Sequence, residues 1–505
     1  MIRSQLPRSA IAVWACPLFV VLTVAAAGAP AEFPLKTVRL TSQEAWQSPG
    51  RSGGFIYAVR PEAIHHEPSA TSSRPLYGTV RGGLTFRLDE SKGTGKGYDR
   101  LLLDLDRDGD LADEDLHFSV KGATPRRSAP TRALFGPIDA PLAATAESVR
   151  PGLYAQMTLY DPKRLAGPEF RPDSMVGHLL LKPSFYLTTT VAVEGVRQRI
   201  ALFDGDCNFH LGDCLKLPMT AEIDPEEWDL QPADYLVRDR DGSGRFERKP
   251  TWEGAEFLGT PTYFGGQPFV LSVNKAMTTL RLEPYAEPLG TLIPTSERPL
   301  RSLTLLQADG TGQGEVLTPG LLDGKVQVPV GTYRLLSCVL AAQVGDGVWT
   351  MVVSRRTAEG ETVSVEAGST SQLRCGVPLI LTVQATNVEP EALWGLSVLP
   401  TKPRPAEVHL KARVTGAGGE LYAGFRQGKN LNHMKGMGPP RFEVIDPRGW
   451  RIGRGTLARQ EQGAYTGSWK VPAWYAGHDV AFRAEFDLGA LDSLKSEPIA
   501  VQLQE

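Results

Sequence analysis

An acidic segment at residues 104–115, called loop one below, has the composition and spacing of a calcium-binding loop. The aspartates at its positions 1, 3, 5, 7 and 12 are Asp104, Asp106, Asp108, Asp110 and Asp115. Calcium takes about six to eight oxygen ligands, and carboxylates this close together repel one another without a cation between them. Gly109 at position 6 allows the sharp turn around the ion. The alternative is a solvated acidic turn.

Two weaker copies follow, loop two (residues 204–215) and loop three (residues 239–250), and each comes after an apolar run. Their oxygen-bearing residues at positions 1, 3 and 5 are Asp204, Asp206 and Asn208 in loop two and Asp239, Asp241 and Ser243 in loop three. Repetition makes a chance match less expected. Phe209 replaces the glycine in loop two, and neither copy has an acid at position 12. These loops therefore bind weakly, borrow Asp213 or Glu247 as a ligand, or have lost the metal.

The segments on both sides of loop one read as β-strands. Residues 98–103 lead into the loop, and residues 116–120 leave it. An EF-hand has a helix on each side of its loop. We therefore expect calcium to brace a turn between strands, which favours a structural ion over a sensor.

The search for catalytic motifs is largely negative, because the sequence has no nucleophile elbow, no zinc-protease motif and no C-x-x-C pair. Asp89, Glu90 and Asp99 leave open a hydrolase that works beside calcium, in which two carboxylates would face each other across a cleft. Weaker metal patterns at residues 65–67 and 433–437 lie in stretches that read as loops. We therefore expect no catalytic residue of a conventional kind.

Composition favours an all-β, multidomain protein. The chain has 505 residues with 52 glycines and 39 prolines, and it lacks long amphipathic helical stripes. This length allows about three domains. The net charge of −3 without a basic patch argues against nucleic acid or an anionic membrane surface as a partner.

The N-terminus, residues 1–31, reads as a secretory signal peptide. Arg3 and Arg8 precede an apolar stretch that ends in small residues with A-x-A cleavage patterns. Lipidation at Cys16 is the less favoured alternative. No other segment is long and apolar enough to span a bilayer. We expect a secreted, periplasmic or cell-surface protein without a transmembrane anchor.

Four of the five cysteines follow the signal peptide. An even number of cysteines in an exported chain suggests disulfide bonds. Cys207 and Cys214 both lie in loop two, where a bridge would impose the curvature that Phe209 does not. Cys338 and Cys375 lie in one later β-domain. We expect these two pairings, with four buried thiols as the alternative.

The rest of the organisation follows from strand patterns and turns. Residues 32–290 form a β-rich domain with the three calcium loops, and residues 291–400 and 401–505 form two sandwiches. The turn at residues 329–333 resembles the P-x-G-x-Y corner of carboxypeptidase-regulatory or transthyretin-like modules. The proline-rich residues 400–405 mark a stiff linker, and the strands beyond it resemble an immunoglobulin-like sandwich.

The run at residues 89–99 before loop one resembles a group of secreted bacterial proteins of unassigned function that carry D-x-[DN]-x-D-G loops in β-rich domains. The resemblance implies export and calcium loops, and it names no reaction. Three functions follow. The first is a calcium-stabilised binding or structural protein of the cell envelope or exterior, with a polysaccharide or another exported protein as ligand. The others are a calcium-dependent hydrolase of polysaccharides or esters, and an inhibitor or partner of another exported protein.

Overall fold

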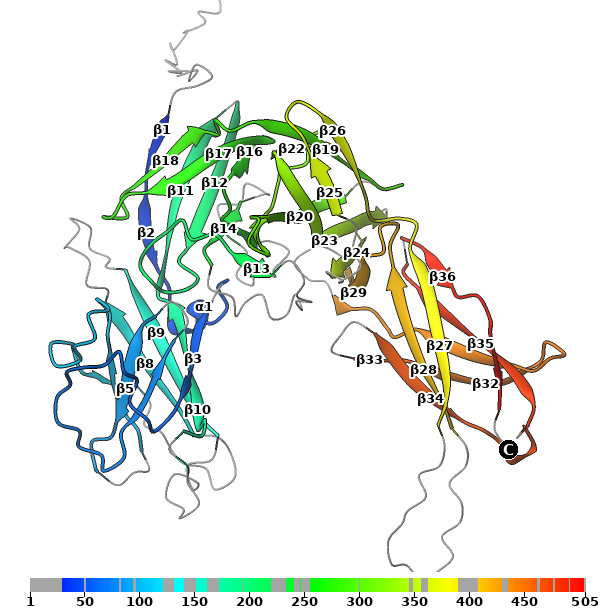
Figure 1. Ribbon diagram of the computed structural model, residues 1–505, viewed down its shortest axis with the longest axis horizontal. Helices are drawn as coiled ribbons and strands as arrows, with labels where there is room; N and C mark the ends of the chain where they lie inside the picture. The colour runs from blue at the N-terminus through cyan, green and yellow to red at the C-terminus, as the bar shows by residue number, and fades with distance from the viewer. Residues whose placement is uncertain are drawn as a thin grey trace, which may run out of the picture.

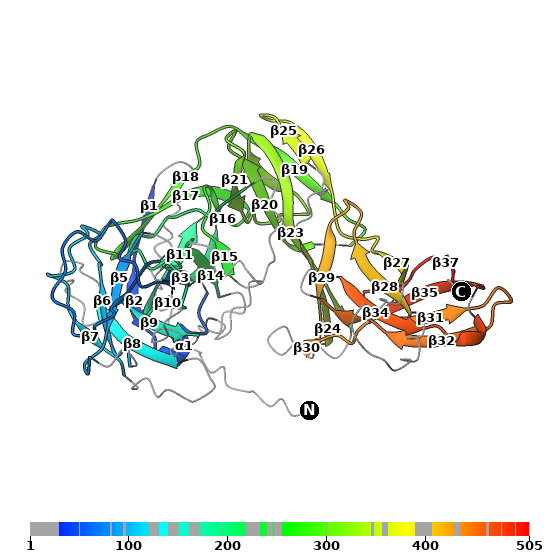
Figure 2. The same cartoon turned by 60° about the horizontal axis from the view of Figure 1, so that its bottom comes forward.

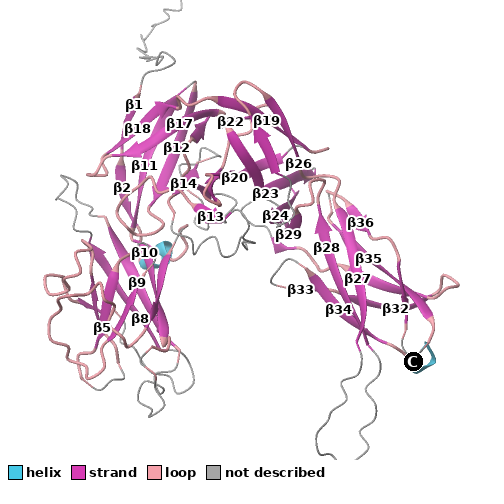
Figure 3. Cartoon of the chain, in the orientation of Figure 1, coloured by secondary structure: helices cyan, strands magenta, loops and turns pink. Residues whose placement is uncertain are grey.

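The computed structural model describes residues 30–49, 51–80, 83–93, 97–120, 131–139, 151–160, 171, 173–193, 195–218, 233–239, 246, 255–298, 300–344, 348–355, 362–388, 407–428, 435–460, 464–475, 477–489 and 491–503. These residues form an all-β, multidomain protein, as predicted, with helix confined in the described residues to short segments such as α1 (Ser42–Ala45) and η4 (Ala473–Tyr475) (Figure 3). Strands within residues 52–183 lie at one end of an arch, and strands within residues 441–502 lie at the other (Figure 1 and Figure 2). Residues 1–29 of the predicted signal peptide (residues 1–31) lie outside the described residues, whereas Ala31 is the first residue of β1 (Ala31–Pro34).

The N-terminal region is a sandwich of two antiparallel sheets. One sheet has the order β3 (Ser52–Ile56), β10 (Gly177–Pro183), β9 (Gly152–Leu159) and β8 (Thr131–Asp139). The other has the order β4 (Leu76–Thr79), β5 (Thr85–Asp89), β6 (Arg100–Leu103) and β7 (His117–Phe118). Both sheets contribute buried apolar side chains to one core, among them Phe86 and Phe135. Loop one connects β6 to β7 at the edge of this sandwich, so the strands predicted on both sides of it are present.

The next region contains two further antiparallel sheets. One has the order β15 (Ala255–Phe257), β14 (Tyr235–Arg238), β12 (Val196–Phe203), β11 (Phe185–Val193) and β2 (Lys36–Arg39). The other has the order β1 (Ala31–Pro34), β18 (Thr279–Pro284), β17 (Gln267–Val273) and β16 (Thr262–Phe264). They share a core that includes Phe185 and Leu282. Loop two follows β12, whose last four residues, 200–203, pair with β14.

A long sheet is formed mostly by strands from the second half of the chain. Its order is β13 (Lys216–Pro218), β21 (Gln313–Leu317), β20 (Leu300–Ala308), β23 (Gly331–Val344), β24 (Val348–Arg355), β29 (Leu421–Gly428), β28 (Glu407–Thr415), β34 (Tyr465–Lys470) and β33 (Ala458–Arg459). At its side, β25 (Thr362–Val365) pairs with β23, β27 (Ile380–Val388) with β28, and β30 (Lys435–Gly436) with β29. Strands before residue 389 thus bond to strands after residue 406. The predicted linker at residues 400–405 lies outside the described residues.

Two smaller sheets complete the second half. One has the order β22 (Val326–Pro329), β19 (Leu289–Thr295) and β26 (Thr370–Arg374). The other has the order β32 (Arg451–Thr456), β31 (Arg441–Ile445), β35 (Asp479–Asp487) and β36 (Ser493–Lys495), with β37 (Ile499–Gln502) paired to β35. At the predicted P-x-G-x-Y corner, the buried Tyr333 hydroxyl donates to the Pro329 carbonyl oxygen at 2.5 Å. This bond fixes the turn between β22 and β23.

The two predicted disulfide bonds are wrong, because all four cysteines of the described chain are thiols. Cys207 is buried in the core of the N-terminal sandwich, whereas Cys214 is partly exposed with its Sγ 3.4 Å from the Thr260 Oγ1. The two side chains therefore pack into different surroundings. Cys338 and Cys375 do share one core, but the Cys338 Sγ lies 3.0 Å from the Tyr422 hydroxyl.

Candidate metal centres

Asp104, the first residue of loop one, is buried at the end of β6. Asp104 is 2% exposed. Its Oδ2 accepts hydrogen bonds from the Thr85 hydroxyl at 2.8 Å and from the Gly109 N–H at 3.3 Å. Its Oδ1 is buried and has no hydrogen-bond partner among the described residues. Because a buried polar atom without a partner is costly, this oxygen points to a ligand that the protein itself does not supply.

Two exposed aspartates of loop one approach Asp104. One carboxylate oxygen of each of Asp104, Asp106 and Asp108 lies within 4.8 Å of the others, close enough to hold a metal ion. The Asp106 Oδ1 accepts the Asp108 N–H at 3.3 Å, and the Asp108 Oδ1 accepts the Asp110 N–H at 2.7 Å. These hydrogen bonds between side chains and the backbone direct successive carboxylates toward the same side of the loop.

Gly109 has the backbone conformation that its position requires. Its φ is +81°, in the left-handed region that favours glycine. A Cβ at this position would lie only 2.3 Å from the Ala63 carbonyl oxygen. The loop therefore needs glycine both for its turn and for its close packing against residues 63–66.

The other two predicted side chains of loop one stand apart from this triad. Asp110 accepts the Ala112 N–H at 2.7 Å and forms an ion pair with the His66 Nδ1 at 2.9 Å. This hydrogen bond to Asp110 raises the pKa of His66, and the same contact lowers the pKa of Asp110. Asp115 is exposed. Neither carboxylate belongs to the group whose oxygens lie within 4.8 Å.

Glu114 is half-buried against loop one, although the sequence pattern does not single it out. Its Oε1 accepts the N–H of Leu105 at 2.6 Å. Partial burial raises the pKa of Glu114 to about 7, and the hydrogen bonds from the backbone oppose this increase. Sequence reasoning missed Glu114 because it occupies position 11, next to the acid expected at position 12.

Loop two has positive φ values at the same two positions, 4 and 6, as loop one, despite its phenylalanine. At position 4, Arg107 and Cys207 have φ values of +66° and +60°. At position 6, Phe209 has a φ of +59°, and its N–H donates to the Asp204 Oδ2 at 2.7 Å, as Gly109 donates to Asp104. A left-handed conformation costs a residue other than glycine roughly 1–2 kcal/mol. Phe209 offsets part of that cost because it packs against the cores on both sides.

The acids of loop two form a second triad, and one of them comes from outside the loop. One carboxylate oxygen of each of Asp204, Asp206 and Asp234 lies within 4.8 Å of the others. These residues are 1%, 5% and 0% exposed. The antiparallel register pairs Phe203 of β12 with Tyr235 of β14, which places Asp234 opposite Asp204. The sequence signal for Asp234 was weak, because it is one acid before a strand whose partner is not known from the sequence.

Burial dominates the electrostatics of this second triad. It raises the pKa of Asp204 well above its usual range, and the negative charges of Asp234 and Asp206 raise it further. Burial likewise raises the pKa values of Asp206 and Asp234. Three ionised carboxylates in such a site are unfavourable without a cation between them. The donor set therefore fits a bound cation.

The remaining predicted ligands of loop two contact each other. Asn208 donates from its Nδ2 to the Asp206 Oδ2 at 3.0 Å and also to the Asp213 Oδ2. Its Oδ1 accepts the His210 N–H at 2.6 Å. The Asp213 N–H donates to the Asp234 Oδ2 at 2.9 Å. These contacts close loop two around its triad.

Only the start of loop three can be compared with the other loops. Asp239 follows β14, and its N–H donates to the Arg199 carbonyl oxygen at 2.9 Å. The other predicted ligands, Asp241, Ser243 and Glu247, lie outside the described residues.

The acids considered for a hydrolase hold neighbouring loops in place. Asp89 is buried, accepts the N–H groups of Thr71 and Ser72 at 2.9 and 2.7 Å, and lies 3.6 Å from the guanidinium of Arg87. Asp99 accepts the N–H and hydroxyl of Ser91 at 2.7 and 2.6 Å. Glu90 is likewise buried, and its Oε1 and Oε2 accept from the Ser72 hydroxyl at 3.3 Å and from the Gly97 N–H at 3.2 Å. These bonds assign all three acids a structural role.

The other weak metal patterns of the sequence do not gather around a common point in the described residues. His66 pairs with Asp110, whereas Glu67 lies 3.0 Å from the Arg87 guanidinium and accepts from the Tyr77 hydroxyl at 3.2 Å. His433 and Met434 lie outside the described residues.

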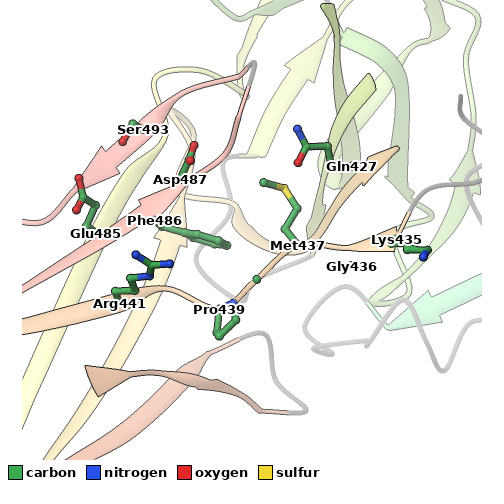
Figure 4. Close-up of a pocket in the computed structure, with 11 residues that line it drawn as sticks. Gln427, Lys435, Gly436, Met437, Pro439, Arg441, Glu485, Phe486, Asp487 and Ser493 are labelled. Atoms are coloured by element: carbon green, nitrogen blue, oxygen red, sulfur yellow. The ribbon is translucent and has the colours of Figure 1, made fainter. Parts of the chain in front are cut away.

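A cavity of about 650 Å³ lies in the C-terminal region beside β30, β31 and β35. Figure 4 shows the acidic side chains of Glu485 and Asp487 on one side of the cavity and the uncharged side chains of Gln427 and Met437 on the other. Arg441 also lines the cavity, opposite Glu485 in the register of β31 and β35. Phe486 is the only aromatic residue among those that line the cavity. It is 2% exposed and offers no open face for stacking.

Comparison with family models and with curated proteins gives no match. Among solved structures, the Bacillus anthracis TIE protein matches at 10% identity over 76% of this chain and 73% of its own, with a TM-score of 0.14. The BSP domain of a biofilm associated protein matches at 9% identity over 94% and 96%, with a TM-score of 0.12. Scores this low carry no argument about fold or function. In the described part of the chain, no helix has the length and apolar character needed to cross a bilayer.

Proposed function

We propose that this is a secreted, calcium-binding protein in which calcium at loops one and two stabilises the N-terminal half of a multidomain binding or structural protein of the cell envelope or exterior. The observation that carries the proposal is the buried Asp104 Oδ1, which has no partner among the described residues and lies in one triad with Asp106 and Asp108. Loop two supports it with positive φ values at the same two loop positions and with a second triad.

The donor atoms favour calcium over a transition metal. Both triads consist of carboxylates, with no imidazole or thiolate among their members. Hard oxygen donors suit calcium and magnesium, whereas zinc and copper favour nitrogen and sulfur. Many acids along a flexible turn suit calcium, because magnesium requires a near-ideal octahedron and retains its waters. The D-x-D-x-D-G spacing of loop one points the same way.

The location of the triads supports a structural ion. Each triad begins at the first residue after a buried strand, β6 or β12. In loop two, the third acid follows from the pairing of β12 with β14, so a cation there would join two strands. Such a cation would resist separation of the strands rather than move two helices apart.

Thermal unfolding of the full chain tests the proposal. We expect the melting temperature to rise in calcium compared with excess chelator, and to rise much less in magnesium. At a calcium concentration about 100-fold above the dissociation constant, one site adds roughly 2.7 kcal/mol to the free energy of unfolding. Asp104→Asn should reduce the calcium-dependent rise, whereas Asp479→Asn, an exposed residue of β35 outside both loops, should leave it unchanged. A wild-type melting curve that is identical in calcium and in chelator contradicts the proposal.

A further inference from the structure

We infer that Glu114, rather than Asp115, is the acid that closes the metal site of loop one. This inference rests on the proposed calcium function and names a ligand at the same site. The twelve-residue pattern assigns this role to position 12, but the fold places a different carboxylate beside the triad.

The two neighbouring acids are arranged differently. Asp115 is exposed, and its carboxylate does not belong to the triad. Glu114 turns back over the loop, and its Oε1 accepts the N–H of Leu105 at 2.6 Å. Leu105 stands between Asp104 and Asp106, so this hydrogen bond anchors the Glu114 carboxylate next to the first two ligands of the loop. The buried Asp104 Oδ1 without a partner in the described chain indicates, independently, that a cation belongs there.

Loop two shows what an acid in this place can do. The Asp234 Oδ1 accepts the N–H of Gly205 at 3.3 Å. Gly205 is position 2 of loop two, as Leu105 is position 2 of loop one. Asp234 also has an oxygen within 4.8 Å of oxygens of Asp204 and Asp206. A carboxylate held by the amide of position 2 is therefore within reach of a cation bound by positions 1 and 3.

The two loops thus obtain the same ligand from different parts of the chain. Loop one takes it from its own position 11, and loop two takes it from the residue before β14. The Glu114 carboxylate stands beside its triad rather than within it, so we expect the cation to draw it inward. Loop one would then open and close by movement of one glutamate side chain, whereas closure of loop two depends on the pairing of β12 with β14.

Calcium titration of full-chain variants by calorimetry tests the inference. Asp104→Asn identifies the binding step that belongs to loop one. Glu114→Gln should weaken that step by roughly tenfold or more, because it removes a charged ligand. Asp115→Asn is the matched control, because it makes the same carboxylate-to-amide change at the neighbouring acid. It should change the calcium affinity of the same step by less than about twofold.

The outcomes separate this inference from the proposed function. Asp104→Asn should retain the calcium-binding step that does not belong to loop one. The same step should be unchanged in Glu114→Gln, and its presence there shows that Glu114→Gln is folded. Wild-type protein that binds no calcium refutes the proposed function. Calcium binding that is weakened by Asp115→Asn, or that is unaffected by Glu114→Gln, overturns the assignment of Glu114 alone.

Discussion

Replacement of Gly109 by alanine should damage loop one in two ways. The φ of +81° costs an alanine roughly 1–2 kcal/mol. In addition, the new Cβ would lie 2.3 Å from the Ala63 carbonyl oxygen and 2.6 Å from the His65 Nδ1, so residues 63–66 must move. That movement strains the bonds from the His65 N–H to the Gly109 oxygen at 3.1 Å and from the Leu111 N–H to the His66 oxygen at 2.9 Å.

Hydrogen bonds of this kind contribute about 1 kcal/mol each. We therefore expect Gly109→Ala to lower the free energy of unfolding by roughly 2–4 kcal/mol, as measured by chemical denaturation. Calcium binding at loop one, measured by calorimetry, should weaken as well, because Gly109 also donates its N–H to the Asp104 Oδ2.

Gly83→Ala is the matched control. Gly83 has a φ of +88°, but a Cβ there meets nothing within 4 Å. The control therefore has the same backbone cost without the clash, and its calcium affinity should equal that of the wild type. Equal losses of stability in the two variants, or wild-type calcium affinity in Gly109→Ala, would refute the reasoning.

Two further predictions concern the four cysteines and Glu420. After denaturation without reductant, Cys207, Cys214, Cys338 and Cys375 should all react with a thiol reagent, and peptide mapping that finds a bridge among them would contradict this. Burial raises the pKa of Glu420 above its ordinary value of 4.5. The folded protein therefore binds a proton at Glu420 more tightly than the unfolded chain does. As a result, the contribution of Glu420 to the free energy of unfolding falls as pH rises above 4.5. The free energy of unfolding of the wild type, relative to that of Glu420→Gln, should decrease as pH rises above about 4.5, and parallel pH curves would show that Glu420 does not titrate in this way.

The strands before loops one and two and the first two carboxylates of these two loops could be predicted because their signals are local. Apolar runs before Asp104 and Asp204 marked strand ends, and the strands β6 and β12 are present there. Gly109 was predictable because a tight turn needs a positive φ. These features depend on residues that are near one another in the sequence.

The closing acids could not be predicted, because they depend on tertiary structure. Asp234 enters its triad only through the register of β12 and β14. Glu114 differs from the expected Asp115 by one position, and the direction of the chain as it leaves the loop decides which of them faces inward. The disulfide prediction failed for a similar reason, since Cys207 and Cys214 are close in sequence but pack against different surroundings.

The calcium content of the full chain after equilibrium dialysis tests the central claim most directly. Each triad should hold one ion, so Asp104→Asn and Asp204→Asn should each bind one calcium fewer per chain than the wild type. Exposed Asp479→Asn should retain the wild-type content. Wild-type protein that emerges from dialysis in millimolar calcium without bound metal, or variants with unchanged content, would contradict the claim that these loops are calcium sites.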